Sequence, residues 1–323
     1  MATTRIYFHS PCFDGIASAV LVWDFLEKRD GWVRPALHPV NYGQRDSWLG
    51  ESLDDPSAVV DFLYHPRAQF WADHHSTTFL AEASRREFES KKDDRRIYDA
   101  NAGSCALLLW DRIYKIFGHR NNRYRELVEW ADKIDSARYS SVEEAVSSVA
   151  PALMIAKGLG IGQTSGYCES LVETLRVQTL TEVAELPEVQ ARSAEVERLT
   201  RLGWDRFTKS LHLEDDGVAV FDVDAQDVFI SRYGAFRLYP QARYSAGITR
   251  LRDSVKITVM RNPWREFFCP PLGKIAEKFG GGGHTRIGSI SLRGDQVASA
   301  PSILAKFLEE MRTAEATAPN PSR

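Results

Sequence analysis

Three short apolar segments near the start of the chain lie close to carboxylates and histidines. Residues 5–8 (RIYF) precede His9, and residues 58–62 (AVVDF) and 69–73 (QFWAD) each contain an aspartate at or near their end. Their length and apolar content are typical of buried strands. Amphipathic helical patterns are predicted at residues 15–28, 103–117 and 124–134. This alternation predicts a doubly wound α/β domain with a mainly parallel sheet, in which ligand groups collect at the carboxyl ends of strands.

The second half of the chain has a different pattern. Residues 166–212 are rich in Glu, Leu, Ala and Arg and predict a helical connector, with Pro187 at a helix start or kink. Strand-like alternation then predicts a smaller α/β domain at residues 213–312, and the small, polar residues 313–323 predict a disordered tail. The predicted strands are residues 217–223, 235–240, 245–251 and 254–260, followed by a short helix and glycine loop at 270–284. The first domain would span residues 1–165.

Composition limits the classes of function. A chain of 323 residues favours two domains, and its net charge of −3 gives no general attraction for nucleic acid, so long duplex DNA is not an expected partner. The four cysteines form no CxxC pair, which argues against a zinc finger or a disulfide framework and favours a reducing cytoplasm. Apolar runs of about 18 residues are absent, so we expect a soluble protein with no membrane partner. The sequence leaves the oligomeric state open, with a homodimer as one alternative.

Several separate segments each offer a carboxylate or an imidazole. These residues are His9, Asp14, Asp61, Asp73, His74, His75 and Asp132. If they meet at one edge of the sheet, their carboxylates repel one another unless cations neutralise them. Oxygen-rich sites with one or two imidazoles suit Mn²⁺ or Mg²⁺, and we expect two divalent ions, with Mn²⁺ preferred.

Two motifs carry a resemblance to a known family. WADHHST (71–77) resembles the motif that names the DHH phosphoesterases, and GGGGH (280–284) is similar to the signature of the DHHA1 domain that follows it in that family. HSPCFDGIASA (9–19), VVDF (59–62) and WAD (130–132) resemble other family motifs in the same order. The resemblance covers about residues 5–312 and implies a metal-dependent phosphoesterase.

The resemblance also implies roles for individual residues. His9 and Asp61 would bind a first metal, and a second would be bound by Asp14, Asp61, His74 and Asp132, with Asp61 bridging. Asp73 and His75 would flank His74 as orienting or substrate-facing groups that assist proton transfer, although strand capping is an alternative for Asp73. Asp135 lies close to Asp132 in the sequence, but Asp132 matches the family position better.

The first motif departs from the family pattern at Cys12, where an aspartate is usual, and its spacing from His9 is one residue shorter than in many members. Cys12 as a thiolate ligand would favour Zn²⁺ or Fe²⁺. Alternatively, Cys12 is inert and the first metal is weak or missing. Both alternatives stay open.

The second domain would bind the nucleotide. Gly281, Gly282 and Gly283 allow close approach of the backbone to an anion, and His284 can donate to a phosphate or base. By resemblance, Arg261 would bind the substrate phosphate. Three nearby residues add charge or a stacking surface, or are simply solvated: Trp264, Arg265 and Arg286.

The predicted function is hydrolysis of phosphodiester or phosphomonoester bonds in small nucleotides, dinucleotides or short single-stranded oligonucleotides. One alternative is a nucleotide-binding sensor that lacks catalysis because Cys12 has altered the metal site. Another is a polyphosphate or pyrophosphate hydrolase, which the DHHA1-like glycine motif disfavours. The choice between RNA and DNA and between linear and cyclic substrates stays open.

Overall fold

The computed structural model of the protein describes residues 4–53, 56–91, 93–162 and 166–317. The chain forms two compact units. The first comprises residues 1–138 and 148–196, and the second comprises residues 139–147 and 197–323. The chain therefore passes from one unit to the other three times.

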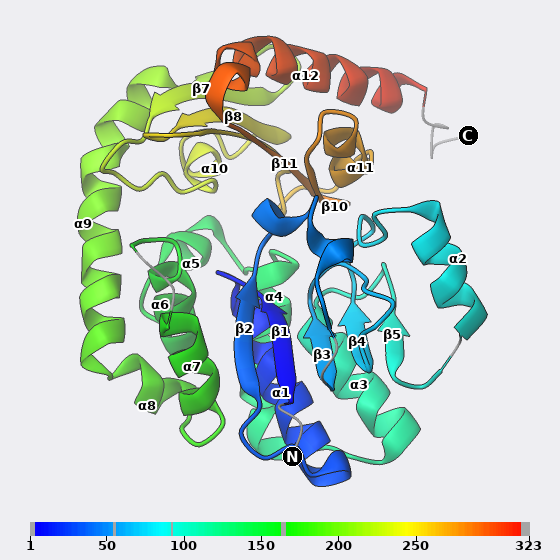
Figure 1. Ribbon diagram of the computed structural model, residues 1–323. Coiled ribbons are helices and arrows are strands. Elements are labelled where there is room, and N and C mark those ends of the chain that lie inside the picture. The colour runs from blue at the N-terminus through cyan, green and yellow to red at the C-terminus, as the bar shows by residue number, and fades with distance from the viewer. Residues whose placement is uncertain (1–3, 54–55, 92, 163–165, 318–323) are drawn as a thin grey trace. The chain divides into compact units, whose positions relative to one another are not determined.

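The first unit is built on a five-stranded sheet whose neighbouring strands all pair in parallel, in the order β2-β1-β3-β4-β5 (Figure 1). The strands are β1 (Arg5–His9), β2 (Ala36–Val40), β3 (Ser57–Val60), β4 (Phe70–Asp73) and β5 (Arg96–Tyr98). Parallel strands end at the same edge of a sheet, so the residues that follow β1, β3 and β4 lie near one another.

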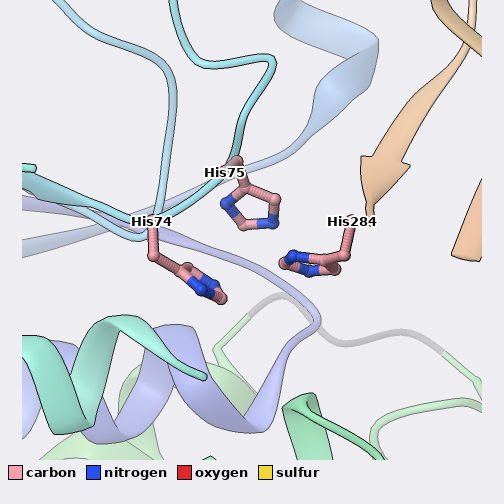
Figure 2. A group of neighbouring side chains, drawn as sticks. All are labelled: His74, His75 and His284. Atoms are coloured by element: carbon pink, nitrogen blue, oxygen red, sulfur yellow. The ribbon is translucent and has the colours of Figure 1, made fainter. Parts of the chain in front are cut away.

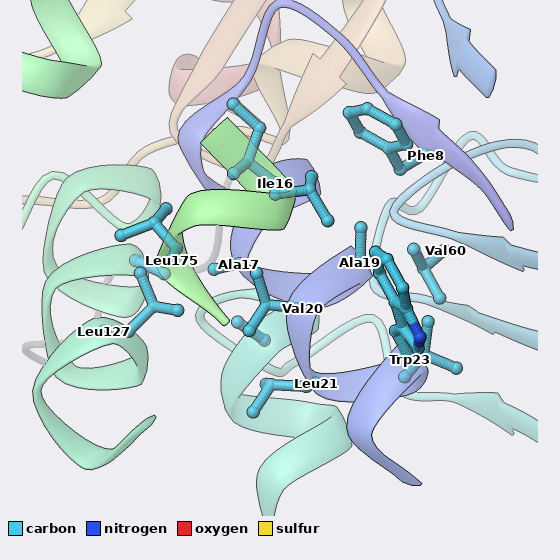
Figure 3. Close-up of a cluster of buried hydrophobic side chains, with 14 of the residues drawn as sticks. Phe8, Ile16, Ala17, Ala19, Val20, Leu21, Trp23, Val60, Leu127 and Leu175 are labelled. Atoms are coloured by element: carbon cyan, nitrogen blue, oxygen red, sulfur yellow. The ribbon is translucent and has the colours of Figure 1, made fainter. Parts of the chain in front are cut away.

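Helix α1 (Phe13–Asp30) is the central helix of the first unit. Every residue from Phe13 to Leu26 is buried, because α1 packs against the sheet and against three other helices. Figure 3 shows its residues Ile16 and Val20 among side chains from the sheet and from α4 and α7, including Phe8 and Leu127. The other helices are α2 (Glu82–Lys91), α3 (Cys105–Phe117), α4 (Arg125–Asp135), α6 (Pro151–Gly158), α7 (Tyr167–Leu175) and α8 (Leu180–Ala184).

The second unit contains a mixed six-stranded sheet in the order β10-β11-β9-β8-β7-β6, in which only β7 and β8 pair in parallel. Its strands are β6 (His212–Leu213), β7 (Val218–Asp224), β8 (Tyr244–Arg250), β9 (Val255–Arg261), β10 (Gly282–His284) and β11 (Ile287–Leu292). Its helices are α5 (Val142–Val146), α10 (Gly234–Leu238), α11 (Leu272–Glu277) and α12 (Ala300–Ala316), and α9 (Pro187–Ser210) runs through both units. One face of the sheet packs on α11 and α12 through apolar residues such as Ile257, Ile290 and Phe307.

This architecture confirms the predicted fold class, but two predicted segments are wrong. Residues 235–240 were expected to be a strand, but residues 235–238 lie in α10 instead. Four or five residues are too few to separate alternation from a helical turn, and α10 packs against α5, a contact between distant parts of the chain. The glycines expected to form a loop include a short strand, β10, which pairs with β11.

The compact units also divide the chain differently from the predicted boundaries. Helices α7 and α8, expected in a connector at 166–212, bury Leu171 and Val183 in the core of the first unit. Residues 139–147, expected in the first domain, belong to the second unit. Within the predicted tail at 313–323, helix α12 continues to Ala316, and residues 318–323 lie outside the described residues.

The described residues include no helix with the length and apolar character needed to span a bilayer.

Candidate functional site

The turn from β1 into α1 brings His9 and Asp14 to one place. His9 is the last residue of β1, Cys12 is the N-cap of α1, and Asp14 lies in the first turn of the helix. A Cβ atom on Gly15 would lie 2.1 Å from the carbonyl oxygen of His9, so only glycine lets the chain turn this tightly. The amides of Cys105 and Ala106, at the start of α3, donate to Asp14 at 2.7 and 2.9 Å and fix its carboxylate.

Asp61 follows β3 and is held in a strained backbone conformation. Its φ is +55°, a left-handed conformation that is rare for residues other than glycine, and it is almost completely buried. Within the described part of the chain, neither of its oxygens receives a hydrogen bond. A buried carboxylate without donors is costly, and backbone strain of this kind clusters at functional sites. Hydrogen bonds within the described part of the protein therefore do not explain the buried position of the Asp61 carboxylate.

Asp73, the last residue of β4, orders the two histidines that follow it, His74 and His75. Its Oδ1 accepts from the amides of His74 and His75 at 2.8 and 3.3 Å and lies 2.7 Å from Nδ1 of His75. Burial alone would raise the pKa of Asp73, but the neighbouring His75 charge and hydrogen bond outweigh it, so that pKa is lowered. The same pair acts on His75, whose pKa is raised despite burial. Asp73 thus fixes the ring of His75 and favours its protonated form.

The ring of His74 lies beside that of His75, with centroids 4.7 Å apart (Figure 2). Its Nδ1 lies 3.0 Å from the carbonyl oxygen of Ala102, which can only accept, so Nδ1 carries the proton of that bond. Nε2 then points at carboxylates, 3.7 Å from Asp14 and 3.6 Å from Asp61. A lone pair facing carboxylates is repulsive unless a second proton or a cation lies between them.

Asp135, rather than Asp132, is the α4 carboxylate that approaches His74. Oδ2 of Asp135 lies 3.3 Å from Nε2 of His74. Asp132 instead pairs with Arg138, and its Oδ1 is buried next to Gly103. The sequence interpretation preferred Asp132 because of its place in WAD, whereas in the structure the last turn of α4 presents Asp135 to His74 and Asp14.

The buried charges strongly affect one another. Burial, together with Asp135, raises the pKa of Asp14 to about 6. Burial and the neighbouring carboxylates of Asp14 and Asp135 raise the pKa of Asp61. Burial, together with His75, lowers the pKa of His9 to about 3, so His9 is neutral and able to ligate. An acidic cluster of this kind is unfavourable without a cation.

Among the described residues of the first unit, two groups of side chains have the spacing of metal ligands. His9, Asp61 and His75 form one group, and Asp14, Asp61 and His74 form the other, with ligand atoms in each group within 4.8 Å of one another. Asp61 belongs to both groups, and it is the residue whose buried oxygens lack donors. Carboxylates with one or two neutral imidazoles suit Mn²⁺ or Mg²⁺, so the residues of these groups fit divalent cations, with His75 as a ligand only in its neutral form. The sequence interpretation had placed His75 beside the metals rather than among their ligands.

Cys12 lies beside this cluster, but it belongs to neither group. Burial and the carboxylates of Asp61, Asp135 and Asp14 raise the pKa of its thiol well above the usual range. Without a cation the thiol is therefore protonated and a poor ligand.

In the second unit, the predicted substrate residues gather at one end of the sheet. Met260, His284 and Ile287 occupy paired positions on β9, β10 and β11, next to Arg261 at the end of β9. Arg261 is buried, and its guanidinium donates to the carbonyl oxygens of Asn262 and Phe267, each at 3.2 Å. These bonds hold the guanidinium in one orientation.

The glycine run has a structural role that the sequence interpretation did not include. A Cβ atom on Gly281 would lie 2.2 Å from the carbonyl oxygen of Ser289, and one on Gly283 would lie 2.3 Å from that of Ile287. Gly283 also has a φ of +141°. These glycines are therefore required for the close pairing of β10 with β11.

Comparison with known proteins found similarity only among solved structures: no family model and no curated protein matches this chain. A pGpG-specific phosphodiesterase, PggH from Vibrio cholerae, is 17% identical with a TM-score of 0.63, and the match covers 95% of this chain and 99% of that one. The DHH domain of a member of the s1p family of ribosomal proteins is 13% identical with a TM-score of 0.59, covering 96% of this chain and 86% of that one.

RecJ from Thermus thermophilus, solved in complex with Mn²⁺, is 14% identical with a TM-score of 0.52. The match covers 99% of this chain and 53% of RecJ, so the chain spans about half the length of RecJ. At these identities the comparison establishes the fold. With its parallel first sheet and mixed second sheet, the chain has the fold of the DHH-domain proteins, as its motifs predict.

Proposed function

We propose that the protein is a divalent-metal-dependent phosphoesterase that hydrolyses phosphodiester bonds in linear dinucleotides or short single-stranded oligonucleotides. The observation that carries the proposal is Asp61, a strained and buried carboxylate without hydrogen-bond donors that is shared by two groups of ligand-like side chains. Divalent cations held by these two groups would neutralise the Asp61 carboxylate.

His9, Asp14, Asp61, His74 and Asp135 are the side chains that would hold the metals. Asp135 takes the place given to Asp132 by the sequence, because it is the carboxylate that lies 3.3 Å from His74. The chemistry that divalent cations supply in such a site is neutralisation of the phosphate charge and acidification of a water nucleophile. Mn²⁺ is the preferred ion, with Mg²⁺ as the alternative; RecJ structures with either ion support a divalent cation.

His75 would transfer a proton to the leaving oxygen. Its ring is held by Asp73 at 2.7 Å, an arrangement that fixes the tautomer and orientation of a catalytic imidazole. The pairing of His75 with His9 and Asp61 allows a metal-ligand role as the alternative. Either role requires Asp73 as the orienting group.

The substrate would be bound through the second unit. Arg261 offers an oriented guanidinium for a phosphate, and His284 adds a donor next to the glycines Gly281, Gly282 and Gly283. The similarity to PggH, described as a pGpG-specific phosphodiesterase, favours a linear dinucleotide.

The test is hydrolysis of pGpG, pApA, a cyclic dinucleotide and 3′-phosphoadenosine 5′-phosphate by the purified protein with Mn²⁺, Mg²⁺ or Zn²⁺. Asp61→Asn should abolish turnover while leaving the circular dichroism spectrum unchanged. The matched control is Asp205→Asn, at an exposed position on α9, which should retain full activity. Saturable nucleotide binding without turnover by any metal would replace the enzyme with the sensor alternative, and Cys12→Asp would then be tested for gain of activity.

A further inference from the structure

The segment from Tyr139 to Ser147 connects the candidate metal centre to the second unit through the chain itself. Helix α4 ends at Asp135, and four residues later the chain belongs to the second unit. Tyr139 is buried there, and α5 within this segment packs against α10. The residue that faces His74 is thus covalently close to a segment that is held by the other unit.

Trp264 anchors this segment. Its indole Nε1–H donates to the carbonyl oxygen of Tyr139 at 2.9 Å. The ring of Tyr233 lies near both residues, 5.4 Å from the ring of Tyr139 and 6.0 Å from that of Trp264. Because Tyr139 is buried, loss of the indole donor would remove a hydrogen bond that is shielded from water, which weakens the hold of Trp264 on this segment.

Asn262, the residue that follows Arg261, holds the backbone of Trp264 in place. The amide of Trp264 donates to Oδ1 of Asn262 at 3.0 Å, and Nδ2 of Asn262 donates to the carbonyl oxygen of Ala242 at 2.8 Å. Asn262 is buried, and its own carbonyl oxygen accepts from the guanidinium of Arg261. The proposed phosphate-binding arginine and the anchor of Tyr139 therefore share one small hydrogen-bonded loop.

The joint between Asp135 and Tyr139 is stiff. The amide of Arg138 donates to the carbonyl oxygen of Lys133 at 2.9 Å and that of Ala137 to Ile134 at 3.3 Å, which is the Schellman pattern of a helix end. Ala137 takes the left-handed conformation, with a φ of +53°.

An ion pair reinforces this joint. The guanidinium of Arg138 pairs with Asp132, one turn before Asp135 on the same helix. The carboxylate of Asp132 therefore stabilises the end of α4 through Arg138. Because these bonds hold residues 132–138 together, a displacement of Tyr139 would also displace the end of α4.

We propose that Trp264 is a positioning residue for the metal centre: by holding Tyr139, it fixes the end of α4 and with it Asp135, and so couples Arg261 in the second unit to the metals in the first. This inference rests on the proposed function, because it takes Asp135 as a metal-facing group. It concerns the carbonyl of Tyr139 and the indole donor, not the aromatic surface that the sequence suggested for Trp264.

The experiment measures Mn²⁺ affinity without nucleotide, by electron paramagnetic resonance of free Mn²⁺, for the wild type and Trp264→Phe. The phenylalanine keeps an aromatic ring and removes only the donor. We expect the Kd for Mn²⁺ to rise roughly 2- to 30-fold, the range of coupling through packed networks. Trp204→Phe, the same change elsewhere in the second unit, should leave it unchanged. Arg138→Gln, at an exposed side chain, should weaken Mn²⁺ binding in the same way.

Hydrogen exchange of residues 136–147, measured on the same samples, separates the outcomes. Faster exchange in Trp264→Phe together with weaker Mn²⁺ binding supports the proposal. Faster exchange with unchanged Mn²⁺ affinity overturns the coupling, and unchanged exchange overturns the anchor itself. Failure of the wild type to bind Mn²⁺ would instead overturn the proposed metal centre, and it would be seen before any variant is compared.

Discussion

Oδ2 of Asp135 lies 3.3 Å from Nε2 of His74, whereas Asp132 turns to Arg138. We therefore expect Asp135→Asn to lower kcat/KM by about 10²–10³, the usual cost of removing one group that stabilises transition-state charge. Asp132→Asn should lower kcat/KM by no more than about tenfold, because it removes an ion pair with Arg138 and not a metal-facing group. Steady-state kinetics with pGpG and Mn²⁺ would measure kcat/KM for both variants. A larger loss in Asp132→Asn than in Asp135→Asn would identify Asp132 as the metal-facing residue.

The hydrogen bond between Asp73 and His75 predicts a second kinetic result. Asp73→Asn should lower kcat by about 10²–10⁴, because the imidazole loses the partner that fixes and protonates it. His75→Gln should have a similar effect, and the double variant should be little worse than either single one, since the two residues act as a unit. Additive losses in this double-mutant cycle would show that they act separately.

Metal removal should change how stability depends on pH. The pKa of Asp14 is about 6 in the folded protein, against an ordinary 3.8, so between these values the folded state binds more protons than the unfolded state. Asp14 should therefore lower the stability of the metal-free protein by about 3 kcal/mol as pH rises through this window, whereas His9, whose pKa is lowered to about 3, acts in the opposite direction. Mn²⁺ binds the ionised form, so it should restore more stability at pH 8 than at pH 5.

Thermal unfolding in EDTA and in Mn²⁺ across this pH range measures both effects. Asp14→Asn removes the Asp14 contribution, so in EDTA the Tm of the wild type relative to this variant should fall between pH 4 and pH 7. A difference in Tm that stays constant over this range would contradict the raised pKa of Asp14.

Gly15 should tolerate no side chain. Gly15→Ala places a methyl group 2.1 Å from the carbonyl oxygen of His9, so the turn between β1 and α1 must shift. We expect a loss of more than about 2 kcal/mol in the free energy of unfolding, together with loss of activity. Gly50→Ala, where a Cβ atom meets nothing within 4 Å, is the matched control and should change stability by less than about 0.5 kcal/mol.

Much of the first unit could be predicted from the sequence. The strands that end near His9, Asp61 and Asp73 are short apolar runs, and parallel pairing brings their ends to one edge. The choice between Asp132 and Asp135 could not be made in this way. It depends on where α4 ends and which face its last turn presents, and helix ends are the least certain part of a sequence-based prediction.

The second unit was harder to predict where contacts are distant in sequence. Helix α10 was expected to be a strand, and its partner α5 comes from a segment about 90 residues earlier in the chain. Gly234 lies against the ring of Phe207 on α9, another contact that no local pattern records. The role of Trp264 was missed for the same reason, because its acceptor is Tyr139, which lies 125 residues away.

Because residues 139–147 belong to the second unit, one cut in the chain cannot separate the two units. Cutting the chain once, at residue 165 or at residue 196, leaves the first unit carrying Tyr139 and α5 without the surface that buries them. Exchange of the second unit between homologous genes through a single crossover would separate Trp264 from the tyrosine it evolved with. The two units are therefore expected to be inherited, expressed and engineered together rather than as interchangeable modules.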